Sequence, residues 1–281
     1  MDVEAFEGFT AQLDDQGVLM VTFDRPETMN ASTIGMKRDL VELLTQAQLD
    51  NAIRVLVFTG TGRGFWAGDD LKNYSSAAGK VTGPIASGHG NPLGTYDALR
   101  VISQAVNVAV RSLDKLTIAA VNGFAIQTGF SFALACDFRI AARSARLGSA
   151  TLRYGLLPDE GGQWLLVQHL GVAKTMDFLM RKRIVAADEA LELGLVHQVV
   201  ADDELAGAAL ELARELADGP QVAMRLLKRS IYLAAESTFP HALDDIATKT
   251  AISDHHADAT VGARAFRDKG PARFNEWLDR A

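Results

Sequence analysis

The chain has 281 residues, is 48% hydrophobic and carries a formal net charge of −7 at pH 7. This length and apolar content suffice for a large core, whereas the acidic balance argues against nucleic-acid binding, which usually needs a basic patch. No apolar run is long enough to cross a membrane and the acidic start is not a signal peptide, so we expect a cytoplasmic protein without a membrane partner.

The first half of the chain alternates expected strands and helices. Residues 17–24 are β-branched and apolar and end before Asp-Arg-Pro, which predicts a strand. Residues 32–50 have apolar side chains near helical spacing, with Ser32 or Thr33 as a plausible N-cap. Residues 53–60 form a nearly continuous apolar run, as in a strand that is buried on both faces.

Residues 72–95 change character, because Gly, Ser, Pro and Asn dominate and no periodicity is visible. A loop of this length in a compact domain is usually functional or mobile. A helical pattern returns over 97–112, residues 117–126 predict an apolar strand, and residues 131–143 predict a short helix that runs into a strand. Cys136 lies in this last run, where a small buried side chain is expected rather than a reactive thiol.

The last 120 residues have an almost entirely helical pattern. We expect helices over residues 162–170, 173–180, 187–193, 203–217, 221–235, 239–256 and 258–268. The pattern predicts an α/β fold with a core over residues 1–200 and a helical C-terminal region over residues 201–281. The C-terminal helices need a partner surface, and a subunit interface is a natural one. The basic run Met180–Ile184 is more simply a solvated helix end than a phosphate-contacting patch.

A glycine-rich turn, "FTGTGRGFWAGDDL" at 58–71, follows one expected strand. Its spacing does not fit a dinucleotide-binding loop, because Phe65 stands where the third glycine is needed, and no Gly-Lys-Ser/Thr follows for a P-loop. Backbone N–H groups around residues 67–71 could hold a developing oxyanion. A simple tight turn is the alternative.

Two further patterns are weaker. The run "GFSFA" at 129–133 is one residue short of a nucleophile elbow. A hydrolase built on Ser131 would also need a downstream acid and histidine, and no histidine is distinguished. The adjacent His255 and His256 would face different directions on a helix, so no metal site is expected.

The stretch "GLLPDEGGQW" at 155–164 places Asp159 and Glu160 between a proline and a glycine pair. Pro158 suits a helix N-terminus, where the helix dipole favours acidic side chains. Capping explains one of the acids but not readily both. The alternative is a catalytic carboxylate in a pocket.

Five motifs occur in an order that resembles the crotonase (enoyl-CoA hydratase/isomerase) superfamily over roughly residues 15–275. They are "FDRPETMNAST" (23–33), "GRGFWAGDDLK" (62–72), "IAAVNGFAIQTGFSFALACDFRIAA" (118–142), "LGLVHQVV" (193–200) and "GARAFRDKGPARF" (262–274). The resemblance implies a crotonase-type repeated ββα spiral core and a helical C-terminal trimerisation region, with homotrimers or hexamers. It also implies acyl-CoA thioester substrates, no metal, and no cofactor, since coenzyme A is part of the substrate.

The resemblance also implies an oxyanion hole, in which two backbone N–H groups hold the thioester carbonyl and stabilise an enolate. By motif position the donors are the amides of Asp69 and Thr128, where the family usually has a glycine run and this chain has Gln127-Thr128-Gly129. The remaining positions that match CoA- or substrate-binding residues are Thr28, Met29, Ala31, Ala67, Gly68, Asp70, Leu71, Phe266 and Lys269. The last two reach CoA from a neighbouring subunit in some members.

The chain departs from the family at the catalytic acids. Hydratases of the family use two glutamates, whose positions hold Ser131 and Thr151, and neither can act as a general base near neutral pH. Family isomerases need one carboxylate, and several carry it where Asp159 and Glu160 lie. We therefore expect an enoyl-CoA isomerase with Asp159 or Glu160 as the acid/base and Glu160 slightly favoured. Such a proton shuttle needs a carboxyl pKa raised by an apolar pocket, against the opposing helix dipole. An atypical hydratase, C–C hydrolysis, dehalogenation and an inactive CoA- or RNA-binding member are the alternatives.

Overall fold

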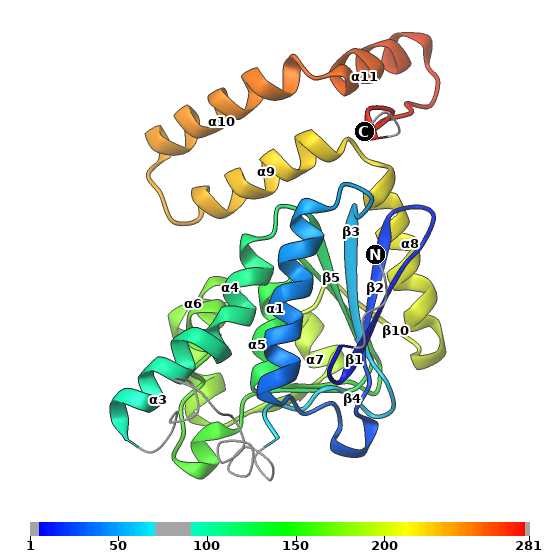
Figure 1. The fold of residues 1–281 in the computed structure, drawn as a ribbon. Helices are drawn as coiled ribbons and strands as arrows, with labels where there is room; N and C mark the ends of the chain where they lie inside the picture. Colours follow the sequence, from blue (N-terminus) through cyan, green and yellow to red (C-terminus); the bar gives the residue numbers. More distant parts are fainter. Residues whose placement is uncertain (1–5, 71–90, 279–281) are drawn as a thin grey trace.

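The computed structural model describes residues 6–70 and 91–278. Its larger sheet has six strands in the order β1-β2-β3-β5-β7-β10 (Figure 1). Only β1 runs antiparallel to its neighbour, and the other pairs are parallel. The strands are β1 (Phe9–Leu13), β2 (Val18–Phe23), β3 (Val55–Gly60), β5 (Leu116–Val121), β7 (Phe138–Ala142) and β10 (Gln198–Val200).

A second sheet has four strands in the order β4-β6-β8-β9, of which only β8 and β9 pair antiparallel. They are β4 (Gly64–Trp66), β6 (Phe124–Ile126), β8 (Arg146–Gly148) and β9 (Ile184–Ala186). The chain repeatedly places one strand in the larger sheet, the next in the smaller sheet and then a helix, as in β5, β6 and α5. This arrangement confirms the expected repeated ββα spiral.

The helices mostly coincide with the segments expected from the sequence. They are η1 (Pro26–Thr28), α1 (Ile34–Leu49), α3 (Pro92–Ala98), the π-helical η2 (Leu99–Ser103), α4 (Gln104–Ser112), α5 (Thr128–Ala135), η3 (Thr151–Tyr154), α6 (Gly162–Met180), α7 (Ala187–Glu192), η4 (Asp202–Glu204), α8 (Leu205–Asp218), α9 (Gln221–Ala234), α10 (Phe239–Asp254) and α11 (Ala257–Asp268). Thr33 caps α1 by accepting a hydrogen bond from the Met36 amide, as expected. Helix α6 bends at Gly171, where two separate helices were expected.

The larger sheet is buried on both faces. Along β3, Leu56 and Phe58 pack into the core that contains α1, whereas Val55 and Val57 pack with α8. Figure 1 shows α1 and α8 on opposite sides of this sheet. The inward side chains of α8 include Ala209, Ala213 and Ala217. Burial on both faces confirms the interpretation of the apolar run at 53–60.

Several expectations are wrong in detail. Residues 117–126 form two strands rather than one, because the chain turns at Asn122 and Gly123. A Cβ at Gly123 would lie 2.0 Å from the Arg63 carbonyl oxygen, so the turn needs glycine. Residues 92–95 are helical rather than loop, with Asn91 as the N-cap, and residues 72–90 lie outside the described part. The short strands β1, β4, β8, β9 and β10 were not predicted.

Helices α9, α10 and α11 lie beyond one end of the larger sheet, and α3 lies towards the opposite end (Figure 1). Helix α8 also follows residue 200, yet it packs on the sheet. A division of the chain at residue 200 stays a prediction. Among the described residues, no helix combines the length and the apolar character that a membrane span requires.

Candidate active site

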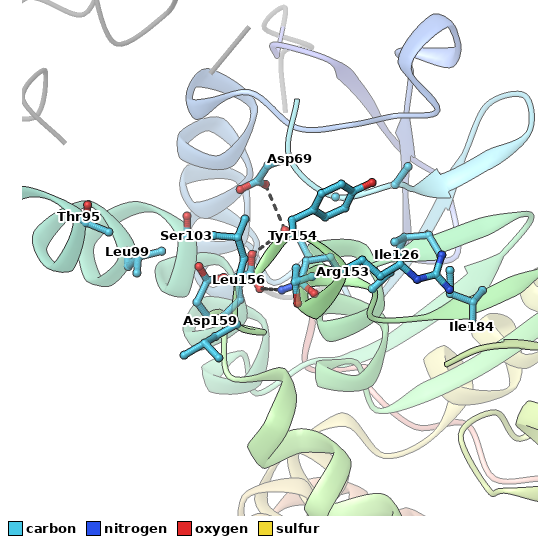
Figure 2. Close-up of a pocket in the computed structure, with 18 residues that line it drawn as sticks. Asp69, Thr95, Leu99, Ser103, Ile126, Arg153, Tyr154, Leu156, Asp159 and Ile184 are labelled. Carbon is cyan, nitrogen blue, oxygen red and sulfur yellow. Dashed lines mark hydrogen bonds between the residues drawn. The ribbon is translucent and has the colours of Figure 1, made fainter. Parts of the chain in front are cut away.

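A cavity of about 560 Å³ lies beside α3, where segments that are distant in the sequence converge (Figure 2). Its lining comes from α3 and η2, the loop after β4, the start of α5, η3 and the segment before α6. Apolar side chains form much of the wall, and the charged side chains that the described residues contribute to the cavity are those of Asp69, Arg153, Asp159 and Glu160. A largely apolar pocket with a few convergent polar groups is the usual form of a small-molecule site.

Glu160 is the most deeply buried acid of the cavity, with 4% of its surface exposed. Its Oε1 accepts a hydrogen bond of 2.7 Å from the Thr128 hydroxyl, and its Oε2 accepts one of 3.0 Å from the side-chain amide of Gln127. Both donors come from the start of α5. The side chain of Glu160 is therefore directed across the cavity to α5 rather than into solvent.

The pKa of Glu160 is raised to about 7. Burial is the main cause, and the negative charges of Asp159 and Asp69 add to it. The Lys37 cation and the Thr128 hydrogen bond oppose the shift. A carboxyl with a pKa near neutral pH can both take up and release a proton, which general acid–base catalysis requires.

Neither acid caps α6. Its N-cap is Gly161, and within the described residues neither acidic side chain accepts a hydrogen bond from an α6 amide. The Asp159 and Glu160 carbonyls instead accept hydrogen bonds of 3.0 and 2.8 Å from Gln104 and Asn107 of α4. The capping interpretation is wrong, and both acids line the cavity.

Asp69, whose side chain is 21% exposed, forms an ion pair with the fully buried Lys37 of α1. The Lys37 Nζ atom lies 2.8 and 2.9 Å from the two carboxylate oxygens and also donates to the Ser103 hydroxyl at 3.0 Å. Oδ1 of Asp69 accepts a further hydrogen bond of 2.9 Å from Ser32, and the Thr128 hydroxyl lies 3.2 Å from it. Because Lys37 is fully buried, this pair is strongly constrained in position.

The amides of Asp69 and Thr128 lie in adjoining segments. A Cβ at Gly68 would stand 3.4 Å from the Ile126 carbonyl oxygen and 3.6 Å from the Gln127 Cβ, so the loop after β4 runs against the start of α5. Within residues 6–70 and 91–278, neither amide donates a hydrogen bond. Gln127, directly before α5, has the strained angles φ 50° and ψ −107°. Thr128 is the first residue of α5, where a backbone N–H has no acceptor inside the helix.

A chain of polar side chains leads from Glu160 to Thr151. The Gln127 amide that donates to Glu160 also accepts, through its Oε1, a hydrogen bond of 2.5 Å from the Ser149 hydroxyl. The Ser149 and Thr151 hydroxyls lie 3.3 Å apart. Thr151, at one of the usual glutamate positions, thus lines the cavity as a hydroxyl.

Ser131, at the other usual glutamate position, is 2% exposed and does not line the cavity. Its Oγ lies 2.5 Å from the position that a Cβ would take at Gly162. A nucleophile elbow presents its serine hydroxyl to the substrate. The hydrolase hypothesis is therefore wrong, because this serine is packed between α5 and α6.

Five of the matched substrate-binding positions line the cavity or lie next to it. Ala67 and Gly68 line the cavity, whereas Thr28, Met29 and Ala31 form the turn next to it. The Ala67 amide donates a hydrogen bond of 3.1 Å to the Met29 carbonyl. This turn therefore supports the cavity loop from outside.

Other positions that match substrate-binding residues of the family lie away from the cavity. The Asp70 carboxylate pairs with Arg25 at 3.0 Å and does not line the cavity. Phe266 is 87% exposed on α11, Lys269 follows that helix, and this region lies at the far end of the molecule from α3 (Figure 1). Leu71 lies outside the described residues.

The sequence interpretation missed Lys37, Ser103 and Gln127. One signal was available for Lys37, because it lies between Met36 and Leu40 on the apolar side of an expected helix, where a lysine needs a buried partner. Nothing in the sequence indicated Ser103, which reaches the site through the π-helical stretch after α3. Such stretches are frequent at functional sites.

Known proteins match this chain over nearly its full length. The family model described as Enoyl-CoA hydratase/isomerase matches residues 14–277. The 1,2-epoxyphenylacetyl-CoA isomerase of Escherichia coli is 36% identical over 92% of this chain and 95% of its own length. A probable enoyl-CoA hydratase of Rhodobacter capsulatus is 32% identical over 92% and 95%. The crystal structure of an enoyl-CoA hydratase from Bacillus anthracis is similar with a TM-score of 0.86, at 28% identity over 95% of this chain and 99% of that one.

Proposed function

The chain belongs to the enoyl-CoA hydratase/isomerase family, and on this premise we propose that it isomerises an enoyl-CoA thioester by moving one proton with the Glu160 carboxyl. The observation that carries the proposal is the environment of Glu160. Its carboxyl is buried at the cavity, is held by Thr128 and Gln127, and has a pKa raised to about 7. A proton shuttle requires such a group.

In the proposed mechanism the thioester carbonyl oxygen lies between the backbone N–H groups of Asp69 and Thr128. The support for this step is that both residues line the cavity and neither amide donates a hydrogen bond elsewhere in the described part of the chain. Two such donors stabilise the negative charge that develops on the oxygen, and the loss of one typically costs about 3 kcal/mol of transition-state stabilisation.

The proton moves between two carbons of the substrate. Ionised Glu160 takes a proton from C2 of a 3-enoyl-CoA, and the electron pair of the broken C–H bond delocalises into the thioester as a dienolate. Protonated Glu160 then returns the proton to C4, which leaves the double bond between C2 and C3 and restores the carboxylate. No water or second acid is consumed.

The proposed substrate carries an apolar acyl group. Tyr154, Leu156 and Leu157 line the cavity and are 74%, 51% and 68% exposed. Apolar side chains that stay exposed beside a cavity are typical of a binding surface for an apolar ligand. Two-glutamate hydration is disfavoured, because Ser131 is packed away and Thr151 offers only a hydroxyl.

Assembly into homotrimers or hexamers also remains part of the proposal. Helices α9, α10 and α11 carry large apolar side chains that are exposed in the single chain. They include Leu227, Ile231, Phe239, Leu243, Ile252 and Phe266. Light scattering on the purified protein measures its oligomeric state directly. A monomer at micromolar concentration contradicts the proposed assembly.

The test is to assay the purified protein with 3-enoyl-CoA and 2-enoyl-CoA esters of several chain lengths. The wild type is expected to interconvert them, Glu160→Gln to lose at least about 100-fold in kcat, and Asp159→Asn to retain more activity. CoA-ester binding should persist in both variants. Full activity of Glu160→Gln contradicts the assignment to this residue, and loss only in Asp159→Asn transfers it to Asp159. A wild type that binds CoA esters without isomerising any contradicts the isomerase, and hydration of 2-enoyl-CoA by that protein favours the atypical hydratase.

A further inference from the structure

We propose that the Thr128 hydroxyl reverses its hydrogen bond when Glu160 gains or loses a proton, and thereby links the Glu160 carboxyl to the Asp69–Lys37 ion pair. The inference rests on the proposed function, in which Glu160 carries the proton. It gives the Thr128 side chain a positioning role that is separate from its backbone amide.

The Thr128 hydroxyl oxygen lies between two carboxyl groups. Oγ1 of Thr128 lies 2.7 Å from Oε1 of Glu160 and 3.2 Å from Oδ1 of Asp69. A threonine hydroxyl has one proton and two lone pairs. If both acids are ionised, that single proton cannot serve both, and one carboxylate oxygen faces a lone pair of the hydroxyl.

Protonation of Glu160 removes this conflict. The Glu160 O–H then donates to Thr128, and the Thr128 O–H donates to Asp69, so each proton has one acceptor. Asp69 remains the anion of the pair, because Lys37 contacts both of its oxygens and Ser32 donates to one of them. The two donations thus end on the Asp69 carboxylate, which also accepts a hydrogen bond from the buried Lys37 cation.

When Glu160 loses its proton, the hydrogen bond between Glu160 and Thr128 reverses its direction. The Thr128 hydroxyl turns to donate to Oε1 of Glu160, while Gln127 continues to donate to Oε2 at 3.0 Å. Asp69 keeps its hydrogen bonds from Lys37 and Ser32. Glu160 therefore keeps its hydrogen bonds in both protonation states with the same heavy-atom positions. In the ionised state, Oδ1 of Asp69 faces a lone pair of the Thr128 hydroxyl at 3.2 Å.

The groups around Glu160 shift its pKa in both directions. Asp159, in the same segment, and Asp69, from the loop after β4, raise its pKa, whereas Lys37 of α1 and the Thr128 hydrogen bond lower it. Arg153 and Tyr154 of η3 line the same cavity. Removal of the Thr128 hydroxyl withdraws a donor from the ionised carboxylate. Because hydrogen bonds to a charged acceptor are stronger than those to a neutral one, the net effect is to favour the protonated form.

The experiment is an infrared titration of the carboxyl C=O band, which does not depend on turnover. Wild type, Thr128→Val and Thr128→Ser are compared, and Glu160→Gln identifies the band by its loss. Thr175→Val is the matched control, because Thr175 is also buried but lies on α6 away from the cavity lining. If Thr128→Val does not fold, Thr128→Ala replaces it.

We expect the Glu160 band of Thr128→Val to titrate at higher pH, with about tenfold less ionised carboxylate at pH 6 than in the wild type. Thr128→Ser and Thr175→Val should titrate as the wild type does. The pH–rate profile of kcat/KM should move with the band in each variant. An unshifted titration in Thr128→Val overturns the inference even if the wild type is an active isomerase. A shifted band in a protein without isomerase activity supports the hydrogen-bond reversal and contradicts only the proposed function.

Discussion

The Ser131 hydroxyl oxygen lies 2.5 Å from the position that a Cβ atom would take at Gly162. Helices α5 and α6 therefore meet at a residue that has no side chain. The contact fixes the first turn of α6 against α5, directly after the segment that carries Asp159 and Glu160.

Gly162→Ala is predicted to lower the free energy of unfolding by about 1–3 kcal/mol, because the added methyl group overpacks the contact. Ser131→Ala removes the Oγ atom, and the double variant should recover most of the loss. Urea unfolding of the four proteins gives the coupling free energy. Gly207→Ala is the control, since a Cβ there meets nothing within 4 Å. Additive effects of the two substitutions would contradict the proposed contact.

Glu160→Gln is predicted to leave the free energy of unfolding unchanged below pH 4.5, to raise it increasingly between pH 4.5 and about 7, and to raise it fully above that range. The pKa of Glu160 is raised from 4.5 to about 7, so between these values the folded state binds more protons than the unfolded state. The stability contributed by the protonated carboxyl is complete below pH 4.5 and is lost progressively as the pH rises from 4.5 to about 7. Glutamine keeps the donor and acceptor of the protonated acid without this loss.

The expected gain in the free energy of unfolding is about 3 kcal/mol at pH 8, measured by urea unfolding at a series of pH values. Glu192→Gln, an exposed glutamate on α7, should show no such divergence from the wild type. Parallel stability curves for Glu160→Gln and wild type across this range would exclude a raised pKa.

Long periodic segments of the fold could be predicted, and short ones could not. The apolar spacing of α1 and the apolar run of β3 each extend over enough residues to define a period. Strands β4, β8 and β9 have three residues each, so they contain no period. Their pairing depends on tertiary packing rather than on local sequence.

In the candidate site, local sequence features could be predicted, whereas contacts between distant residues could not. The sequence indicated Asp159 and Glu160, because capping did not readily explain both acids and because several isomerases of the family that the chain resembles carry a carboxylate there. It did not indicate that Gln127 and Thr128 hold the Glu160 carboxyl, because this contact joins residues more than 30 positions apart. The Lys37 contact to Asp69 likewise depends on how α1 packs against the loop after β4.

Cys136 is predicted to be unreactive in the folded protein. The pKa of its thiol is raised to about 12, mainly by burial, and the thiolate is the form that reacts. Ellman's reagent at pH 8 should therefore give no signal until denaturant is added and then one thiol per chain, since the sequence has a single cysteine. Prompt labelling of the native protein would mean that this region opens in solution.

Asp137 is predicted to anchor α9 to the larger sheet. Its carboxylate accepts hydrogen bonds from the Thr117 amide and hydroxyl at 2.8 and 2.9 Å, from Lys228 at 2.7 Å and from the Tyr232 hydroxyl at 2.6 Å. Lys228 and Tyr232 belong to α9, and Lys228 is 5% exposed. One carboxylate thus joins β5 to the first of the three C-terminal helices.

Asp137→Ala should lower the free energy of unfolding by about 3–5 kcal/mol, because it leaves the buried Lys228 cation without its anion. Tyr232→Phe removes one hydrogen bond to a charged acceptor and should cost about 1.5–3 kcal/mol. Limited proteolysis should cut Asp137→Ala between α8 and α9 faster than the wild type, since α9 loses its attachment before the sheet unfolds. Asp254→Ala, an exposed aspartate at the end of α10, should match the wild type in both measurements. If Asp137→Ala unfolds and is cleaved as the wild type is, this carboxylate does not hold α9 in place.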